Sequence, residues 1–253
     1  MSPLIISRRD IRRFGKGAAL GVLWRQWRAE RRLARAGVHF RDTDPAQVAA
    51  AYAAMSEADY EAINARQDWA NWRTIPRALS GHVPDRPLRI LDLGCGAGGS
   101  AAVLAFYAPP GSHVTGYEIA EPLLAFARRR AYRRRDGAPA QVDFRAQGVT
   151  EPFRDIAGEL LPDRAVDVVN ASGVVGHHLT GPTIGPLIDE LKRTLHDDGA
   201  AMLDVGPTLG QKELTAVMQA AGFVALGRYR SWFGDPTGQV VFRRASASSG
   251  GQG

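Results

Sequence analysis

The chain has 253 residues, of which 45% are hydrophobic and 23% charged, a composition that excludes fibrous and wholly disordered proteins. It holds one cysteine, Cys95, which excludes an internal disulfide, so we expect a reducing, cytoplasmic location. The net charge of +6 is uneven: residues 1–41 contain eleven Lys or Arg and two acidic residues, and the remainder is negative overall.

The basic N-terminal segment contains no stretch near the ~20 consecutive apolar residues that a transmembrane helix needs. Residues 7–11 resemble a twin-arginine export signal, but the apolar run after them is short and follows Lys16. We therefore favour a cytoplasmic protein. The positive charge of residues 1–41 predicts contact with a polyanion, and Trp24 and Trp27 fit contact with an anionic membrane surface equally well.

The first third of the chain is predicted to be helical. Residues 10–36 form one or two helices that stop near Gly37. Asp44 before Pro45 predicts a helix over 44–55, and Ser56 with Asp59 predicts a capped helix towards Leu79. We divide the chain into a basic arm (1–43), a helical cap or lid (44–80), a main domain (81–244) and a disordered tail (245–253).

From Leu88 onwards short apolar runs alternate with helical patterns, as in βαβ units. The predicted strands are 89–93, 113–118, 141–146, 165–171, 200–205, 224–232 and 238–243. The predicted helices are 122–135, 186–195 and 212–221, with turns at 196–199 and 234–238. This order predicts an α/β, Rossmann-like fold: a seven-stranded, mostly parallel sheet with helices on both faces, a C-terminal antiparallel hairpin and an N-terminal helical appendage.

The segment Leu88 to Ser100, LRILDLGCGAGGS, runs from a strand through glycines into a helix. Glycines leave bare backbone where a ligand must approach closely, and the N–H groups at the helix start bind polar or anionic groups. Gly94, Gly96 and Gly99 also satisfy the dinucleotide pattern G-x-G-x-x-G, so the segment alone does not identify its ligand.

The next strand ends in Glu118, twenty-four residues after Gly94. A carboxylate at this place accepts both hydroxyls of a ribose, a role common to several nucleotide-binding families. Glu118 is therefore the strongest polar candidate in the ligand site.

LDLGCGAGG resembles the first motif of class I S-adenosylmethionine-dependent methyltransferases, in which an acid two residues before the first glycine supports the loop; Asp92 holds that position. The resemblance extends over 88–243 and includes the terminal hairpin, which is unusual for a dehydrogenase. It implies S-adenosyl-L-methionine as cofactor and methyl transfer as the reaction.

The resemblance also implies a set of cofactor-binding residues. They are Asp92, Gly94, Cys95, Gly96, Gly98, Glu118, Ile119, Gln147, Gly148, Val149 and Asn170. Where the family often has an acid that recognises adenine, this chain has Gly148, so Gln147 or a backbone carbonyl is expected to substitute. Asn170 is open to a second interpretation, as a residue that caps its strand.

His177 and His178 follow the fourth predicted strand and are the candidates for a general base, which is needed only if the acceptor must lose a proton. A structural role in ordering the loop remains open for both. The residues that would form a lid over the acceptor, or dock the appendage on the main domain, are Tyr60, Trp69, Trp72 and Arg73. No metal site is expected.

Three functions remain at this point. The first, which we favour, is methyl transfer to a small molecule, with the helices of 44–79 forming the acceptor pocket. The second is methylation of RNA or another polyanion, held by residues 1–41. The third is a nicotinamide-dependent oxidoreductase or a nucleotide-binding protein without catalysis. The acceptor, the atom that is methylated and the oligomeric state are left open by the sequence.

Overall fold

The computed structural model describes residues 2–12, 16–38, 44–231 and 238–245. Its strands are β1 (Arg89–Leu93), β2 (His113–Glu118), β3 (Gln141–Ala146), β4 (Val166–Ala171), β5 (Leu195–Asp204), β6 (Phe223–Tyr229) and β7 (Gln239–Arg244). Its helices are α1 (Lys16–Arg35), α2 (Pro45–Ala53), α3 (Glu57–Leu79), α4 (Gly99–Tyr107), α5 (Glu121–Arg129), α6 (Val175–His178), α7 (Gly185–Thr194) and α8 (Gln211–Ala220).

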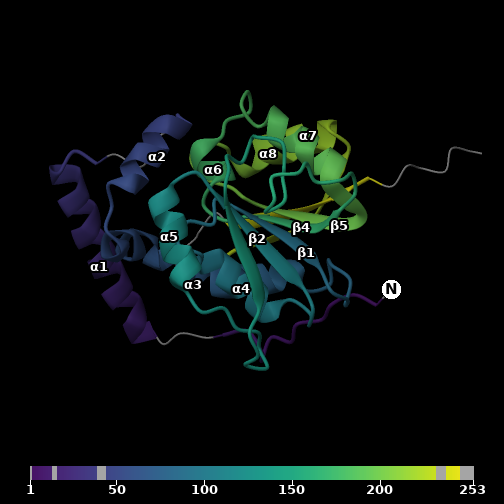
Figure 1. Cartoon of the computed structure of the whole chain (residues 1–253), viewed down its shortest axis with the longest axis horizontal. Helices are drawn as coiled ribbons and strands as arrows, with labels where there is room; N and C mark the ends of the chain where they lie inside the picture. The colour runs from purple at the N-terminus through teal and green to yellow at the C-terminus, as the bar shows by residue number, and fades with distance from the viewer. Residues whose placement is uncertain (1, 13–15, 39–43, 232–237, 246–253) are drawn as a thin grey trace, which may run out of the picture.

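The strands form one seven-stranded sheet in the order β3-β2-β1-β4-β5-β7-β6 (Figure 1). Strands β1 to β5 are parallel, and β7 runs antiparallel to both β5 and β6. The predicted fold class is confirmed, including the C-terminal hairpin. The predicted turn at 234–238 and tail at 245–253 lie, apart from Gly238 and Ala245, outside the described residues.

The sheet is buried on both faces because successive side chains of its central strands point to opposite sides. Leu91 and Val169 pack with apolar side chains of α6, α7 and α8. Their neighbours Ile90 and Val168 pack with α3 and α4 on the other side, and the two helical layers flank the sheet in Figure 1. The order places the carboxyl ends of β1 and β4 side by side at the centre, where chain connections diverge and ligands bind in such sheets.

In the N-terminal appendage, the first residues of α2 and α3 are capped as the sequence predicts. Asp44 accepts a hydrogen bond from Ala46 N at 2.9 Å and caps α2, and Ser56 accepts one from Asp59 N at 3.1 Å and caps α3. Helix α1 lies along α3, with Ala19 and Val22 of α1 packed on Trp69. The appendage is thus joined to the main domain through α3, one side of which also packs on α4.

The first residues of the chain belong to the main domain by packing. Leu4 and Ile6 are part of the core on the α4 side of the sheet, and Leu4 N donates to Val83 O at 2.8 Å. The Tyr107 hydroxyl donates to Asp10 O at 3.1 Å. Leu4 and Ile6 of the predicted basic arm thus pack on the predicted main domain.

Helix α5 and strand β5 do not have the predicted ends. Helix α5 stops at Arg129 instead of residue 135, because Arg130 is extended and Tyr132 turns inward to pack on Phe144 of β3. Strand β5 begins at Leu195 and includes residues 196–199, which the sequence predicts as a turn. Leu195 pairs with Val166 of β4, and an irregularity in the β4–β5 register accommodates the intervening residues.

Candidate functional site

The glycine segment forms the connection between β1 and α4, at the carboxyl end of the sheet. Gly94, Gly96 and Gly98 have φ of 63°, 53° and 81°, a left-handed conformation that side chains disfavour. A Cβ atom on Gly94 would overlap Val174, and one on Gly96 would overlap the Tyr60 hydroxyl. The loop therefore keeps glycine for both its conformation and its close neighbours, and it exposes backbone to the space above it.

Asp92 supports this loop from inside the protein. Its carboxylate accepts hydrogen bonds from Ser100 Oγ at the start of α4 and from Asn170 Nδ2 on β4, each at 2.7 Å. Asn170 Oδ1 accepts in turn from Gln239 Nε2 at 2.9 Å. Burial raises the pKa of Asp92 to about 7, although the two hydrogen bonds oppose the shift.

Asp92 and Asn170 are fully buried in this network and line no described cavity. Their side chains hold the loop, α4 and β4 together. That both bind the cofactor stays a prediction.

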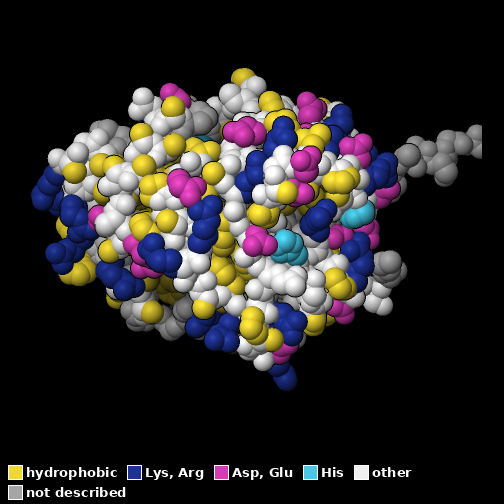
Figure 2. Space-filling view, in the orientation of Figure 1, with side chains coloured by type: hydrophobic (Ala, Val, Ile, Leu, Met, Phe, Trp, Pro, Cys, Tyr) yellow, Lys and Arg dark blue, Asp and Glu magenta, His cyan; other side chains and the backbone are white. Residues whose placement is uncertain are grey.

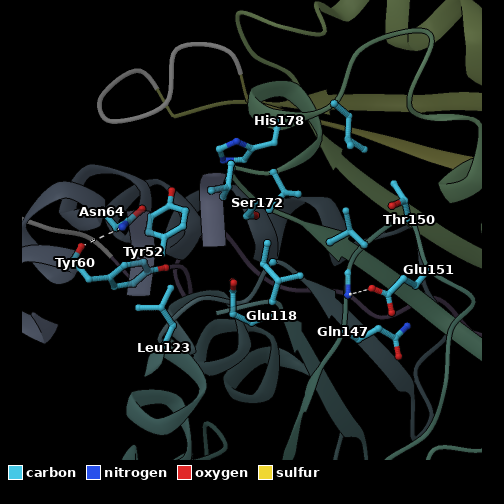
Figure 3. Close-up of a pocket in the computed structure, with 18 residues that line it drawn as sticks. Tyr52, Tyr60, Asn64, Glu118, Leu123, Gln147, Thr150, Glu151, Ser172 and His178 are labelled. Carbon is cyan, nitrogen blue, oxygen red and sulfur yellow. Dashed lines mark hydrogen bonds between the residues drawn. The ribbon is translucent and has the colours of Figure 1, made fainter. Parts of the chain in front are cut away.

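Glu118 links the end of β2 to the same loop. Its carboxylate accepts from Gly96 N at 3.1 Å and from Ala120 N at 2.9 Å. Burial raises the pKa of Glu118, and the backbone hydrogen bonds act against that rise. Each oxygen retains a lone pair for a further donor, and the side chain faces the cavity in Figure 3.

A cavity of about 220 Å³ opens above this edge of the sheet (Figure 3). Of the residues singled out from the sequence, it is lined by Tyr60, Gly94, Glu118, Ile119, Gln147, Gly148, Val149 and His178. Val48 and Tyr52 of α2 and Asn64 of α3 close it from the appendage side. The Tyr52 and Tyr60 rings meet edge to face, with centroids 5.8 Å apart.

After β3 the polar groups are arranged differently from the sequence prediction. The Gln147 side chain turns away from the cavity, donating to Pro152 O at 3.1 Å and accepting from Arg145 Nε at 3.0 Å. Glu151 folds back instead, so that Gly148 N donates to its Oε1 at 3.1 Å (Figure 3). A Cβ on residue 148 would lie 2.7 Å from that oxygen. Glu151 lines the cavity and is absent from the sequence-based set.

A second, smaller cavity of about 30 Å³ lies between the glycine loop and α3. Gly94 and Cys95 of the loop face Asp68 and Asn71 of the helix there. Burial raises the pKa of Asp68 to about 6, and the positive charge of Arg130 counteracts this shift. Within the described part of the chain, no donor hydrogen-bonds the Asp68 carboxylate. Asp68 sits in mid-helix with no motif around it, so the sequence offered no signal for this residue.

Comparisons with known proteins agree on the domain. Residues 90–199 match the sequence model of a family described as "Methyltransferase domain". The class follows from that match together with the seven-stranded sheet and the glycine loop. The chain carries a class I S-adenosylmethionine-dependent methyltransferase domain. It is an enzyme domain whose cofactor is S-adenosyl-L-methionine. The glycine segment is therefore the methyltransferase motif and not a dinucleotide-binding motif.

Solved structures resemble this methyltransferase domain at low identity, and 785 chains match. A Listeria monocytogenes protein described as S-adenosylmethionine-dependent methyltransferase is 14% identical, with a TM-score of 0.51 and coverage of 72% of this chain and 100% of that one. A TehB-like methyltransferase from Corynebacterium glutamicum is 20% identical (TM-score 0.48; coverage 67% and 86%). YcgJ from Bacillus subtilis is 17% identical (TM-score 0.44), and the alignment covers 56% of this chain and 65% of YcgJ. No curated protein sequence matches.

The two histidines of the methyltransferase occupy different environments. His178 lines the larger cavity beside Ser172 (Figure 3). His177 lies outside the cavity lining and interacts electrostatically with Asp204. Burial raises the pKa of Asp204, and the interaction with His177 opposes that rise. The Asp204 carboxylate also accepts from the N–H groups of Val174, Val175 and Gly176 at 2.9 to 3.1 Å. Asp204 thereby holds the short helix that carries both histidines.

The four predicted lid residues are separated by the structure. Tyr60 reaches the cavity, whereas Trp69 packs under α1 and Trp72 packs edge to face on Phe106 of α4 at 5.3 Å. Arg73 lines neither cavity. The reason is helical geometry: α3 turns its face with Tyr60, Asn64 and Asp68 to the loop, and the tryptophans occupy its other sides.

Three further features concern the described residues only. None of the helices in the ranges given above is long and apolar enough to cross a membrane. In the same ranges no group of three His, Cys, Asp or Glu side chains is placed to hold a metal ion. Cys95 is buried and not part of a disulfide.

Proposed function

We propose that the methyltransferase transfers the methyl group of its cofactor to a small molecule, which enters the cavity between the sheet edge and helices α2 and α3. The lining of the larger cavity carries this proposal. It contains no Lys or Arg, and its two ionisable acids are Glu118 and Glu151. A polyanionic acceptor would meet negative charge there, whereas a small, partly apolar acceptor fits against Val48, Leu123 and Leu179.

The residues at the site fit S-adenosylmethionine in four respects. Glu118 has lone pairs for the ribose hydroxyls, and the backbone of Gly94 lines the cavity beside it. Glu151, fixed by Gly148 N, takes the place of the missing acid as acceptor for the adenine amino group. Asp68 is the acceptor for the α-ammonium group. When bound, the cofactor supplies a methyl group on a sulfonium, activated for attack by a nucleophile.

Methyl transfer from a labelled cofactor tests the acceptor class. We expect label to enter the low-molecular-mass fraction of a cell extract and not purified RNA offered at equal mass. The competing assignment is an RNA or other polyanion acceptor bound through residues 1–41, favoured by their positive charge. That assignment requires label in RNA, a transfer that weakens steeply with salt and is lost when these residues are removed. We also propose a cytoplasmic location.

The substitution Asp68→Asn is expected to weaken S-adenosylhomocysteine binding about tenfold at neutral pH, because a charge-assisted hydrogen bond to the ammonium is lost. The pKa of Asp68 is raised to about 6, so its charged form increases as the pH rises through that value. Calorimetric titration should show affinity rising with pH in the native protein and a smaller rise in the variant.

A control variant separates this effect from general changes. Asp189→Asn removes an exposed carboxylate on α7 that lines neither cavity, and it should leave the affinity and its pH dependence unchanged. Arg130 and Glu61 also carry charge near Asp68, but both are retained in Asp68→Asn. An unchanged affinity for the nucleoside in Asp68→Asn across this pH range would remove Asp68 from the site.

His178 is proposed as the side chain that faces the acceptor and, if the acceptor carries a proton, receives it. His178→Asn should lower kcat for the acceptor at least about tenfold while S-adenosylhomocysteine affinity stays within about twofold. His177→Asn should act mainly on stability through its interaction with Asp204. Equal kcat in the native protein and His178→Asn would contradict the assignment.

A further inference from the structure

Helix α1 carries a row of large apolar side chains on its outer side. Leu20, Leu23, Trp24 and Trp27 are 73%, 37%, 57% and 51% exposed. Their spacings of three and four residues place them along one side of the helix. We call these four residues the α1 stripe.

The α1 stripe is separate from the side by which α1 is attached to the protein. That side consists of Ala19, Val22, Ala29 and Leu33, which are at most 9% exposed and pack on α3 and its neighbours. The attachment therefore already has its own apolar residues. Exposed tryptophans and leucines gathered on one helix side are uncommon on soluble surfaces and mark a place of contact.

Arginines border the α1 stripe. Arg25, Arg28, Arg31, Arg32 and Arg35 are all exposed, and Glu30 is the acid within the helix. The guanidinium groups of Arg28 and Arg31 lie over the rings of Trp24 and Trp27 at 4.6 and 4.8 Å. In Figure 2 dark blue side chains gather at the edge of the molecule where Figure 1 shows α1.

We propose that α1 docks the protein on an anionic lipid bilayer. Tryptophan and leucine side chains enter the headgroup region of a bilayer, and arginines bind the lipid phosphates beside them. The apolar row together with a cationic border is the arrangement that such a surface requires. This inference goes beyond methyl transfer and does not depend on the acceptor.

Two other occupants fit the helix less well. A nucleic acid would use the arginines but would leave Leu20 and Leu23 exposed, because its backbone offers no apolar surface to them. A second copy of the chain packed symmetrically on the same stripe would bring the five arginines of each α1 towards those of the other, and the like charges repel. A bilayer satisfies both sets of side chains.

The test is co-sedimentation of the full chain with vesicles of phosphatidylcholine alone or mixed with phosphatidylserine. We expect binding to the mixed vesicles at least about tenfold stronger than to neutral ones, and weaker binding as salt is raised. The double substitution Trp24→Ser with Trp27→Ser, and separately Arg25→Gln with Arg28→Gln and Arg31→Gln, should each lower binding at least about tenfold.

Matched controls use residues elsewhere on the surface. Ile156→Ser with Leu160→Ser removes apolar side chains that are 47% and 51% exposed, and Arg164→Gln removes an exposed arginine paired with Asp197. These variants should bind vesicles like the native protein. S-adenosylhomocysteine affinity and the thermal midpoint, measured for every variant, show that the fold is intact.

The proposal is overturned if the native chain ignores phosphatidylserine vesicles, or if folded α1 variants bind them as the native chain does. It is also overturned if the native chain does not bind vesicles but binds RNA or forms a concentration-dependent dimer, and the α1 substitutions abolish that RNA binding or that dimer.

Discussion

Glu118→Ala is expected to weaken S-adenosylhomocysteine binding about 100-fold or more. The carboxylate is proposed to accept both ribose hydroxyls, and each charge-assisted hydrogen bond contributes about 1.5–3 kcal/mol. The substitution also releases Gly96 N and Ala120 N, which Glu118 holds at 3.1 and 2.9 Å. Calorimetric titration measures the change directly.

Matched variants show which part of the loss belongs to the ligand. Glu118→Gln retains an oxygen acceptor without the charge and should weaken binding about tenfold. Glu121→Gln changes an exposed acid at the start of α5, paired there with Arg128, and should have no effect. Glu151→Ala removes a single proposed contact, so its loss of S-adenosylhomocysteine affinity should lie between the losses in Glu121→Gln and Glu118→Ala. Native affinity in a folded Glu118→Ala protein would refute the assignment of Glu118.

The second large effect is expected at Asp92, on stability. Burial raises its pKa to about 7 in the folded protein, against an ordinary value of about 3.9. A raised pKa means that the folded state holds the proton more tightly. The contribution of Asp92 to stability is therefore largest below about pH 4, and it is lost as the pH rises to about 7. This difference between the two pKa values corresponds to on the order of 4 kcal/mol.

Urea unfolding across this pH range tests the prediction. Asp92→Asn is neutral, retains an oxygen that accepts from Asn170 Nδ2, and replaces the oxygen that accepts from Ser100 Oγ with an amide group that can donate to it. Its unfolding free energy should therefore fall less with rising pH than that of the native protein. Asp92→Ala leaves both partners unpaired and should lower the unfolding free energy at every pH by about 2–6 kcal/mol. Asp189→Asn is the control. A native pH dependence that Asp92→Asn fails to reduce would contradict the raised pKa.

The strands were predictable because local patterns decide them. β1, β2 and β3 have the predicted bounds, since short apolar runs between glycine and proline have few alternatives to a buried strand. The caps of α2 and α3 were predictable for the same reason: Asp44 and Ser56 act on N–H groups two and three residues away. By contrast, the end of α5 at Arg129 depends on the distant contact of Tyr132 with Phe144.

The ligand site shows the same division. Gly94, Gly96 and Glu118 were predicted as site residues because their spacing in the chain reflects one strand-loop-helix unit. Asp68, by contrast, faces the glycine loop only because α3 lies across it, and Glu151 lies beside Gly148 only because the chain after β3 folds back there. Neither contact leaves a pattern in the neighbouring residues.

The sequence by itself determined the fold class, the glycine loop and the acid after β2, because their causes are local: strand burial, bare backbone and a carboxylate at a strand end. Only the tertiary structure decided the rest. It placed Asp92 and Asn170 inside a buried network, separated His178 from His177, and left the α1 stripe uncovered. These outcomes depend on how helices far apart in the chain pack, which the sequence pattern of any one helix does not specify.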